Sequence, residues 1–414
     1  MNKTPEDSSV TATDSAPARP PASLDGLRVL DLSRVVAGPL CAQMLADHGA
    51  QVDKVEPPGG DESRRLGPPF DESGDAAYFG ALNRGKRSLA LDLSRPAGRA
   101  VLERLLVGAD VVIENFLPGT MEKWGLGYAD VLSARYPRLI YCSVSGFGAD
   151  GPLGGLPGYD AVLQAMCGLM SINGTPESGP LRIGVPVVDY LTGCNATVGV
   201  LLALAARQRS GLGQRVEATL FDAGLALLMP HASNWLYSGS APQLLGSAHP
   251  NIVPYDSFKA GDGELFLGIV NDAQFRRFCS CVEREDLASD ARFADNAARL
   301  ANRQLLRAEI ERILAGQSVA SLCEDLMRRG IPAGPVNTVP QALTQPHATH
   351  RRMLLEQDGY RCVGIPVTLS DTPGRVERRP PRLAEHSELI LTELGYDVAG
   401  IAALRADGAL PAPA

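Results

Sequence analysis

The chain has 414 residues, 45% hydrophobic and 21% charged, which is typical of a globular protein with two or three domains of about 150 residues each. Its 39 lysines and arginines against 47 aspartates and glutamates give a net charge of −8, so no overall basic field exists to hold a nucleic acid or an anionic membrane. The eight cysteines are scattered without metal-ligand spacing, which predicts no metal site and a reduced, cytoplasmic setting. The longest apolar stretches, 198–206 and 223–230, are much shorter than the roughly 20 residues of a membrane-spanning helix.

The first structured segment is expected to follow a disordered tail. Residues 1–23 are rich in Ser, Thr, Ala and Pro and carry no apolar targeting segment. An apolar run of strand length at 27–32 is followed by a Gly38-Pro39 turn, by apolar residues at helical spacing, and by a second strand pattern at 51–56. This order predicts a βαβ unit, whose parallel strands need helices on the faces of the sheet.

The same alternation continues along the chain. Further strands are expected at 88–93, 110–113, 139–144 and 215–218, and helices at 96–107 and 192–207. Residues 146–186 hold many glycines and prolines, which predicts a long irregular segment close to something bound. Together these patterns predict an α/β domain with an open parallel sheet over 24–225.

The pattern changes after residue 225. An Asp-Gly turn at 262–263 joins two strand patterns, and helical patterns follow at 273–282, 303–314 and 319–329. These elements predict a linker and a small α+β domain over 226–335, which ends at a proline-rich boundary. Residues 336–414 contain an apolar segment at 363–369 and a helical pattern at 389–394, and are expected to return and complete the large domain.

Familiar catalytic signatures are incomplete in this chain. Residues 146–151 have the letters of a dinucleotide fingerprint, but Pro152 and further glycines follow where that motif needs a helix, so a nicotinamide-dependent oxidoreductase is a distant alternative. The six histidines lack the spacing of a metal site or of a Ser-His pair, and no serine lies in a Gly-x-Ser-x-Gly motif. The Gly38-Pro39 turn is the better candidate for a nucleotide loop, although an ordinary turn explains it equally well.

Asp189 is the strongest candidate among the carboxylates. It follows the apolar run 183–188 and precedes a helix expected to begin near Leu191, so an N-cap role is one interpretation. The alternative is that a helix start and an apolar approach place this carboxylate beside free backbone donors. With an ordinary pKa of about 3.9 it would be an anion at neutral pH and would attack an electrophile without an activating base. Position alone leaves both interpretations open.

A series of short motifs runs along the chain from Leu24. They are Leu24-Asp25-Gly26, Val29-Leu30-Asp31, Ala37-Gly38-Pro39, Lys54-Val55-Glu56, Asn83-Arg84-Gly85-Lys86-Arg87-Ser88, Glu114-Asn115-Phe116, Gly158-Tyr159-Asp160, Gly211-Leu212-Gly213-Gln214 and Gly330-Ile331-Pro332. Together they resemble the class III coenzyme A transferases, whose superfamily includes α-methylacyl-CoA racemase. The resemblance implies a Rossmann-like open parallel sheet, a smaller α+β domain and an interlocked homodimer.

The same resemblance assigns roles to individual residues. It places the nucleophile at Asp189 and implies coenzyme A contacts at Arg34, Val35, Ala37, Leu91, Asn115, Lys123 and Tyr159, with Lys86 and Arg87 nearby. Two positions that are polar or basic in the formate enzyme are Val36 and Pro157 here. The glycine-rich loop that shields the formyl-transfer site is also missing, its place taken by 268–274, which argues against formate or oxalate as the substrate pair.

Position 159 separates the two chemistries of the superfamily. The racemases have Gly-His-Asp there, and their histidine exchanges the proton next to the thioester. A tyrosine with a pKa near about 10 is a poor base for this task at neutral pH, so Tyr159 favours transfer over the racemase or epimerase alternative. A buried aromatic residue with one hydrogen bond is the structural alternative for Tyr159.

Within the transferases, residues 158–168, 246–255 and 271–275 look most like the succinyl-CoA:dicarboxylate branch. The donor is then expected to be succinyl-CoA and the acceptor a dicarboxylate such as glutarate or a relative. A dicarboxylate needs a second cationic or amide contact for its remote carboxylate, and the candidates from the loops are Arg182, His249, Asn251 and Asn271.

The implied reaction passes through an aspartyl anhydride and an aspartyl-CoA thioester and uses coenzyme A thioesters as substrates, with no tightly bound cofactor. Each tetrahedral intermediate carries an oxyanion, for which backbone N–H groups after Asp189 are the expected donors. A non-catalytic coenzyme A binder is a further alternative. The acceptor acid is not identified by the sequence.

Overall fold

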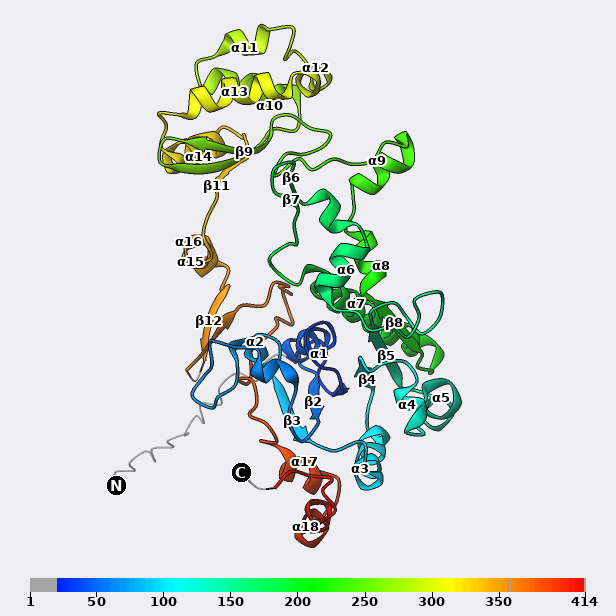
Figure 1. Ribbon diagram of the computed structural model, residues 1–414. Helices are drawn as coiled ribbons and strands as arrows, with labels where there is room; N and C mark the ends of the chain where they lie inside the picture. Colours follow the sequence, from blue (N-terminus) through cyan, green and yellow to red (C-terminus); the bar gives the residue numbers. More distant parts are fainter. Residues whose placement is uncertain (1–20, 358, 413–414) are drawn as a thin grey trace, which may run out of the picture. The chain divides into compact units, whose positions relative to one another are not determined.

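The computed structural model describes residues 21–357 and 359–412 (Figure 1). The chain divides into two compact units. Among the described residues, the first consists of 21–31, 42–111 and 365–412, and the second consists of 32–41, 112–357 and 359–364. The predicted tail at 1–23 lies almost wholly outside the described residues, and the domain boundaries expected at 24, 226 and 336 stay predictions.

The main sheet has six strands in the order β3-β2-β1-β4-β5-β8, which confirms the predicted α/β class. Neighbouring pairs β1–β2, β2–β3 and β5–β8 are parallel. The strands are β1 (Arg28–Asp31), β2 (Gln51–Glu56), β3 (Lys86–Ala90), β4 (Val111–Glu114), β5 (Ile140–Ser145) and β8 (Arg215–Thr219). β2 to β5 are buried along most or all of their length, as expected where helices cover both faces of a parallel sheet.

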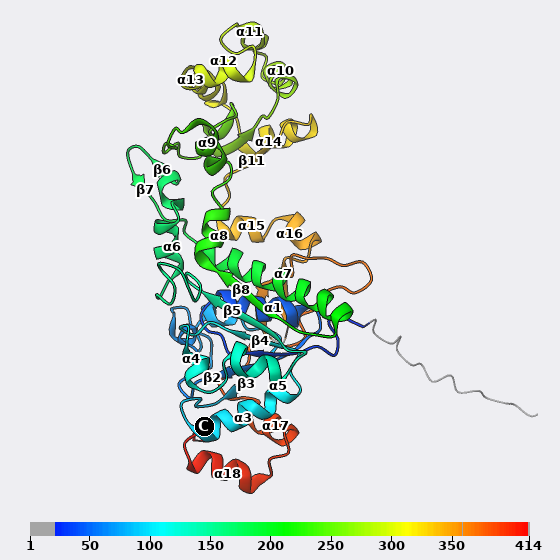
Figure 2. The same ribbon diagram turned by 90° about the vertical axis from the view of Figure 1, so that its right-hand side faces the viewer.

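In the first unit, the C-terminal segment packs on β3. Ser88 O accepts a hydrogen bond from His386 N at 3.0 Å, and Ser387 Oγ accepts one from Ala90 N at 3.3 Å. Figures 1 and 2 show α17 and α18 at the same end of this unit as α3. The remaining elements are η1 (Glu62–Arg65), α2 (Ala77–Gly80), α3 (Pro96–Val107), α17 (Ser387–Glu393) and α18 (Val398–Ala406); α1 (Ala37–Asp47) begins in the second unit. The predicted helix at 389–394 is therefore confirmed as α17.

The glycine-rich stretch 146–186 is more regular than predicted. It contains α6 (Asp160–Met166), the 3₁₀ turn η3 (Leu169–Ile172) and a two-residue hairpin of β6 (Gly174–Thr175) and β7 (Gly179–Pro180). A Cβ on Gly146 would lie 3.1 Å from the backbone of Gly158, so the two glycines allow the chain after β5 to cross the start of α6. The expectation of irregular backbone throughout is wrong, while the expected close backbone approach is present.

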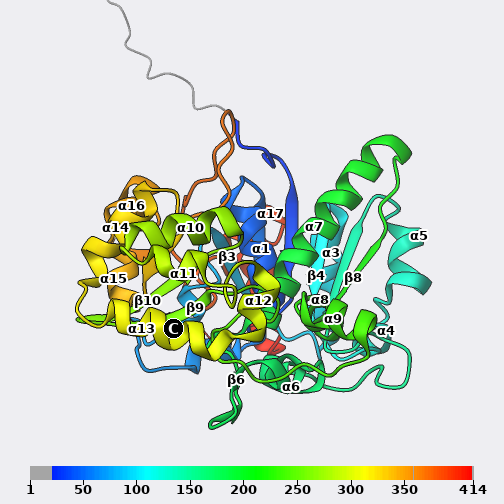
Figure 3. The ribbon, with the colours of Figure 1, turned by 90° about the horizontal axis from the view of Figure 1, so that it is seen from above.

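Helix α7 (Val187–Ser210) is the longest helix and lies along β8 (Figure 3). By length and composition it could cross a membrane, but helices in protein cores meet the same criteria, and α7 packs on β5, β8 and α8. A Cβ on Gly193 would lie 2.7 Å from Ala37 O and 3.0 Å from Leu40 Cδ2. The missing side chain therefore lets α7 pass directly against the first turn of α1.

The second unit contains several further short elements. They are α4 (Thr120–Lys123), the π turn η2 (Tyr128–Leu132), α5 (Ser133–Arg135), α8 (Leu220–Ala226) and α9 (His231–Ser238).

The predicted small α+β region has a core of its own. Its three-stranded antiparallel sheet has the order β11-β10-β9, and the predicted Asp-Gly turn joins β9 to β10. Phe275, Phe278 and Leu306 are among the fully buried residues of this core. The elements are β9 (Tyr255–Ala260), β10 (Gly263–Gly268), β11 (Ala333–Pro335), α10 (Asp272–Cys281), α11 (Glu285–Ser289), α12 (Asn296–Ala301), α13 (Arg303–Leu314) and α14 (Val319–Arg328).

The segment after this core contains α15 (Val339–Leu343) and α16 (Pro346–His350). A hairpin of β12 (Leu354–Gln357) and β13 (Tyr360–Val363) follows. The apolar segment 363–369 contributes no strand to the six-stranded sheet: Val363 ends β13, and the residues after it form no strand.

Candidate active site

The loops that follow β1 and β4 are bonded to each other through one asparagine. Asn115 Oδ1 accepts a hydrogen bond from Arg34 N at 2.9 Å, and Asn115 Nδ2 donates one to Arg34 O at 2.8 Å. The Arg34 guanidinium lies 5.8 Å from the centre of the Phe116 ring. The structure therefore brings together two residues, Arg34 and Asn115, that the sequence assigns to one site.

Val35, the next residue, has a φ of 70°, in the left-handed region that a β-branched side chain rarely adopts. Such backbone strain persists where surrounding contacts enforce it, and it is concentrated at binding and catalytic sites. Val36 and Ala37 are buried directly after it, and Ala37 begins α1. The turn from β1 into α1 thus has the features of a ligand-binding loop.

The first turn of α7 is capped by a carboxylate from another helix. Asp160, which is 6% exposed and begins α6, accepts hydrogen bonds on Oδ1 from Val188 N at 2.8 Å and from Asp189 N at 3.3 Å. A carboxylate at this position satisfies N–H groups that have no partner within the helix and interacts favourably with the helix dipole. The N-cap interpretation of Asp189 is therefore wrong: α7 begins at Val187, and Asp160 provides the cap.

A buried glutamine ties Asp160 to the segment before α7. Gln164 donates from Nε2 to Asp160 Oδ2 at 2.7 Å and accepts on Oε1 from Ile183 N at 2.9 Å. It lies one turn after Asp160 on α6 and is fully buried. Asp160 and Gln164 together fix the segment 183–189 that carries Asp189.

The Asp189 carboxylate has no hydrogen-bond or ion-pair partner among the described residues. It is half-buried, and burial together with the nearby negative charge of Asp160 raises its pKa to about 7. The expectation of an ordinary pKa is therefore wrong, and about half of the groups are ionised at neutral pH. A poorly solvated carboxylate without donors is a stronger nucleophile than one in water, because less solvation is lost when it attacks.

The expected oxyanion donors are not free. Tyr190 N, the first amide after Asp189, donates to Pro186 O at 2.9 Å, and Val187 N donates to Val185 O at 2.8 Å. Since Asp160 takes the amides between them, the first turn of α7 is fully engaged within the chain.

Asp189 lies on the part of α7 that packs against the start of α1. Asp189 and Gly193 are four residues apart on α7 and so lie on the same face of the helix, one turn from each other. Gly193 contacts the first turn of α1 at Ala37 and Leu40. The face that carries Asp189 is therefore directed toward the loop of Val35, Val36 and Ala37.

Three predicted coenzyme A residues are buried in the first unit. Lys86 Nζ donates to Asp31 Oδ2 at 2.8 Å and to Asn83 Oδ1 at 2.7 Å, and desolvation lowers its pKa to about 8. Arg87 donates to both oxygens of Asp53 and to Glu393. Leu91 is 1% exposed. These side chains have structural partners, and their contact with coenzyme A stays a prediction.

Three other predicted residues are exposed. Lys123 ends α4, Tyr159 precedes α6 with 70% of its surface exposed, and Arg182 lies in the segment before α7. The structural alternative for Tyr159, a buried aromatic residue, is wrong. All three side chains are available to a ligand.

The remaining candidates lie between residues 249 and 271. His249 Nδ1 accepts a hydrogen bond from Asn251 N at 3.0 Å, and the side chains of Asn251 and Asn234 bond to each other at 2.7 and 3.1 Å. Asn271 instead caps α10, because its Oδ1 accepts from Gln274 N at 2.9 Å. The structure thus groups His249 with Asn251, and gives Asn271 a structural role.

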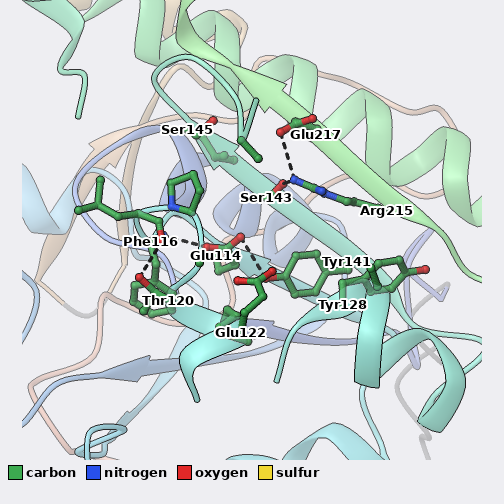
Figure 4. Close-up of a pocket in the computed structure, with 17 residues that line it drawn as sticks. Glu114, Phe116, Thr120, Glu122, Tyr128, Tyr141, Ser143, Ser145, Arg215 and Glu217 are labelled. Atoms are coloured by element: carbon green, nitrogen blue, oxygen red, sulfur yellow. Dashed lines mark hydrogen bonds and ion pairs between the residues drawn. The ribbon is translucent and has the colours of Figure 1, made fainter. Parts of the chain in front are cut away.

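A pocket next to Asn115 is lined by residues of β4, β5, β8 and α4 (Figure 4). Glu114 lies at its wall and accepts hydrogen bonds from Phe116 N at 2.8 Å and from the Tyr141 hydroxyl at 3.1 Å. Burial raises the pKa of Glu114 to about 7. Arg215 is the one basic lining residue and is paired with Glu217 at 3.1 Å, so the pocket is unsuited to a phosphate group.

Sequence reasoning missed Asp160, Gln164 and Glu114. Asp160 and Glu114 stand inside motifs that were recognised, Gly158-Tyr159-Asp160 and Glu114-Asn115-Phe116, so a signal was present. Their roles depend on hydrogen bonds to backbone amides, which sequence spacing does not reveal. Gln164 had no such signal.

Comparisons with known proteins place this site in context. The family model described as CoA-transferase family III matches residues 24–387. A succinate–glutarate CoA-transferase from Agrobacterium fabrum is 42% identical over 92% of this chain and 98% of its own length, and a succinyl-CoA:glutarate CoA-transferase from Mus musculus is 35% identical over 94% and 90%. The crystal structure of a CAIB/BAIF family protein from Brucella suis matches 90% of this chain and 99% of its own, with a TM-score of 0.82 and 42% identity.

The contact of Asp160 with the first turn of α7 predicts how Asp189 titrates. Asp160→Asn removes a neighbouring negative charge, so the pKa of Asp189 should fall from about 7 while staying above 3.8, because burial remains. Carboxyl ¹³C titration of protein labelled at aspartate, with Asp189→Asn to assign the signal, measures this. The control Gln164→Ala removes hydrogen bonds without changing charge and should leave the pKa near 7. An unchanged pKa in Asp160→Asn would contradict the electrostatic account.

Proposed function

The chain belongs to CoA-transferase family III, whose enzymes transfer coenzyme A between carboxylic acids, and from this premise we propose that it moves coenzyme A from succinyl-CoA to a dicarboxylic acid acceptor. One observation carries the proposal. Asp189 is a half-buried carboxylate without a donor or cation partner among the described residues, with a pKa raised to about 7, on the helix face directed toward the turn before α1. This is the environment of a nucleophile rather than of a structural carboxylate.

In the first half of the reaction, an oxygen of Asp189 attacks the thioester carbonyl of succinyl-CoA. The carbon–sulfur bond breaks, and the products are a succinyl-aspartyl anhydride and the coenzyme A thiolate. The thiolate then attacks the aspartyl carbonyl of the anhydride and releases succinate. Asp189 is left as a thioester with coenzyme A.

The second half repeats these steps in reverse. The carboxylate of the acceptor attacks the aspartyl thioester, releases the thiolate and forms a new anhydride with Asp189. Attack of the thiolate on the acceptor's carbonyl gives the product thioester and restores the aspartate. No ATP is consumed, because each bond formed replaces one of similar energy.

The structure supports a defined position for the nucleophile during these steps. Asp160 and Gln164 hold the segment 183–189, so Asp189 does not depend on substrate to be ordered. Pre-positioning of reacting groups accounts for a large share of catalysis in reactions between two bound partners. Since the first-turn amides of α7 are engaged, we assign the oxyanion donors to groups outside this turn.

For coenzyme A we propose contacts at the Arg34–Asn115 pair, at Val35 and Ala37, and at the exposed Lys123 and Tyr159. The mutual hydrogen bonds of Arg34 and Asn115 leave the Arg34 side chain beside Phe116. Leu91, Lys86 and Arg87 are buried, which favours a structural role over direct contact. Val36 and Pro157 offer no polar side-chain group, so they contribute shape only.

The dicarboxylate class rests on the relatives, since two of them are named for succinate or succinyl-CoA and glutarate. Which dicarboxylic acid this chain uses is left to experiment. We propose a cytoplasmic, reducing setting, which the scattered spacing of the eight cysteines in the sequence favours.

We also propose that the chain acts as a homodimer. Large apolar side chains are exposed on α7 and around α9, among them Leu202, Met229, Leu236 and Tyr237, the last with 95% of its surface exposed. Large apolar side chains left exposed within one short segment, as Met229, Leu236 and Tyr237 are, mark an interaction surface. Light scattering should give twice the chain mass of 43.8 kDa. A mass of one chain across micromolar concentrations would rule the dimer out.

The reaction itself is tested by incubating the protein with succinyl-CoA and a panel of dicarboxylic acids without ATP. We expect new acyl-CoA and free succinate in equal amounts, with glutarate among the acceptors. In deuterated water a 2-methylacyl-CoA should gain no deuterium at its α position, whereas a racemase would exchange that proton. Exchange without transfer would contradict the proposal, and binding of coenzyme A with neither reaction would identify a non-catalytic binder.

A further inference from the structure

The side chain of Glu114 holds the chain in place where β4 ends (Figure 4). Glu114 is the last residue of β4, and its carboxylate accepts hydrogen bonds on Oε2 from Phe116 N at 2.8 Å and on Oε1 from the Tyr141 hydroxyl at 3.1 Å. Tyr141 lies on the neighbouring strand β5. The first bond closes a turn directly after β4, and the second ties this turn to the sheet.

Asn115 lies inside this turn and connects it to the loop that follows β1. Backbone bonding between the two chain segments continues as far as Leu32 N, which donates to Ile113 O at 2.8 Å. Beyond that bond, the Asn115 side chain bonds to both Arg34 N and Arg34 O, at 2.9 and 2.8 Å. Val35, with its φ of 70°, follows immediately. All of these residues belong to the second compact unit, so these contacts lie within one unit.

Phe116, at the end of the turn, borders the side chain of Arg34. Its ring packs edge-on against Trp124, with ring centres 5.2 Å apart, and lies 5.8 Å from the Arg34 guanidinium. An aromatic ring attracts an arginine at this distance. Glu114 therefore fixes the backbone of Arg34 through Asn115 and the surroundings of its guanidinium through Phe116.

A buried carboxylate is a costly way to build a turn. Glu114 is 7% exposed, and in the part of the chain that the structure describes no cation lies within ion-pair distance of it. The nearby charged groups are Arg215, which is paired with Glu217, and the exposed Glu122 on α4. A buried charge without a counter-ion destabilises a fold, and such groups are concentrated at functional sites.

We propose that Glu114 is a positioning residue of the coenzyme A site, which holds Asn115 and Phe116 so that the loop of Arg34 and Val35 keeps the conformation that binds coenzyme A. This inference rests on the proposed function, which assigns that loop to coenzyme A. It deepens the assignment, because it names the buried group on which the shape of the loop depends.

The bonds of Glu114 are separate from those that position the nucleophile. Asp160 and Gln164 hold the segment that carries Asp189, and Glu114 takes no part in their hydrogen bonds. Loss of Glu114 should therefore weaken the binding of coenzyme A and leave the chemical steps nearly unchanged. Because coenzyme A is an anion, removal of a nearby negative charge would by itself tighten its binding. Weaker binding thus reports lost positioning and not lost charge.

The test compares Glu114→Ala and Glu114→Gln with the wild type at pH 8, where most Glu114 side chains are ionised because their pKa is about 7. We expect Glu114→Ala to raise the calorimetric Kd of coenzyme A and the KM for succinyl-CoA about 10-fold, and to change kcat less than about 3-fold. Glu114→Gln keeps an oxygen that accepts from Phe116 N and should lose only about 3-fold. The control Glu122→Gln removes the same charge from an exposed side chain at the same pocket and should weaken neither constant.

A double-mutant cycle asks whether Glu114 acts through Asn115. In an Asn115→Ala background the connection to Arg34 is already lost, so Glu114→Ala should raise the Kd less than about 3-fold further. Two effects that multiply in full would overturn the proposal. So would a fall in kcat with an unchanged KM, because it would place Glu114 in the chemical steps.

The loop can also be followed without coenzyme A. The Val35 methyl signals in ¹³C NMR, assigned with Val35→Ala, should shift in Glu114→Ala and stay in place in Glu122→Gln. Unchanged signals in Glu114→Ala would contradict the proposal. Should Glu114→Ala fail to fold by circular dichroism, Glu114→Gln takes its place in the cycle and in the NMR comparison, with smaller changes of the same sign expected.

Failure of the proposed function has a different signature. A wild-type protein that neither binds nor transfers coenzyme A removes the proposed function and with it the role of the loop. Normal transfer by the wild type, together with an unchanged Kd in Glu114→Ala, removes this inference alone.

Discussion

The hydrogen bonds from the first turn of α7 to the buried Asp160 carboxylate are the contact on which the site depends. They allow the helix to begin at Val187, which places Asp189 inside the first turn instead of in front of it. The negative charge of Asp160 also makes ionisation of the neighbouring Asp189 less favourable. One buried group thus positions the nucleophile and adds to the rise in its pKa that burial causes.

This arrangement explains how the chain can act without a Ser-His pair. An ionised carboxylate carries no proton, so no catalytic base is needed to activate it. With a pKa near 7, a sufficient fraction of the Asp189 side chains is ionised at neutral pH. Gly193 brings the helix against the start of α1, where Val35 keeps a strained backbone. Both features cost stability, because the Asp189 carboxylate is held partly out of water and Val35 adopts a left-handed backbone conformation. Such costs are common at functional sites.

The sequence predicted local features well. α3 and α13 have the predicted bounds, and α3 has the expected signals, Pro96 at its start and Gly108 after its end. Prediction from the sequence failed where a side chain or helix start depends on a partner that is distant in the chain. The start of α7 depends on an acceptor 28 residues earlier. Lys86, which the resemblance places near coenzyme A, is buried and pairs with Asp31 from 55 residues away. Asp189 was identified by its motif, but its pKa is set by tertiary burial, which spacing does not encode.

The central claim is that Asp189 carries first the acyl group and then coenzyme A, and trapping the covalent enzyme with hydroxylamine during turnover tests it directly. Cleavage by trypsin after Arg182 and Arg207 releases residues 183–207, in which Asp189 is the one carboxylate side chain. The account predicts a hydroxamate on this peptide, formed with succinyl-CoA and absent without it. A hydroxamate on any other peptide, with 183–207 unmodified, would contradict the account.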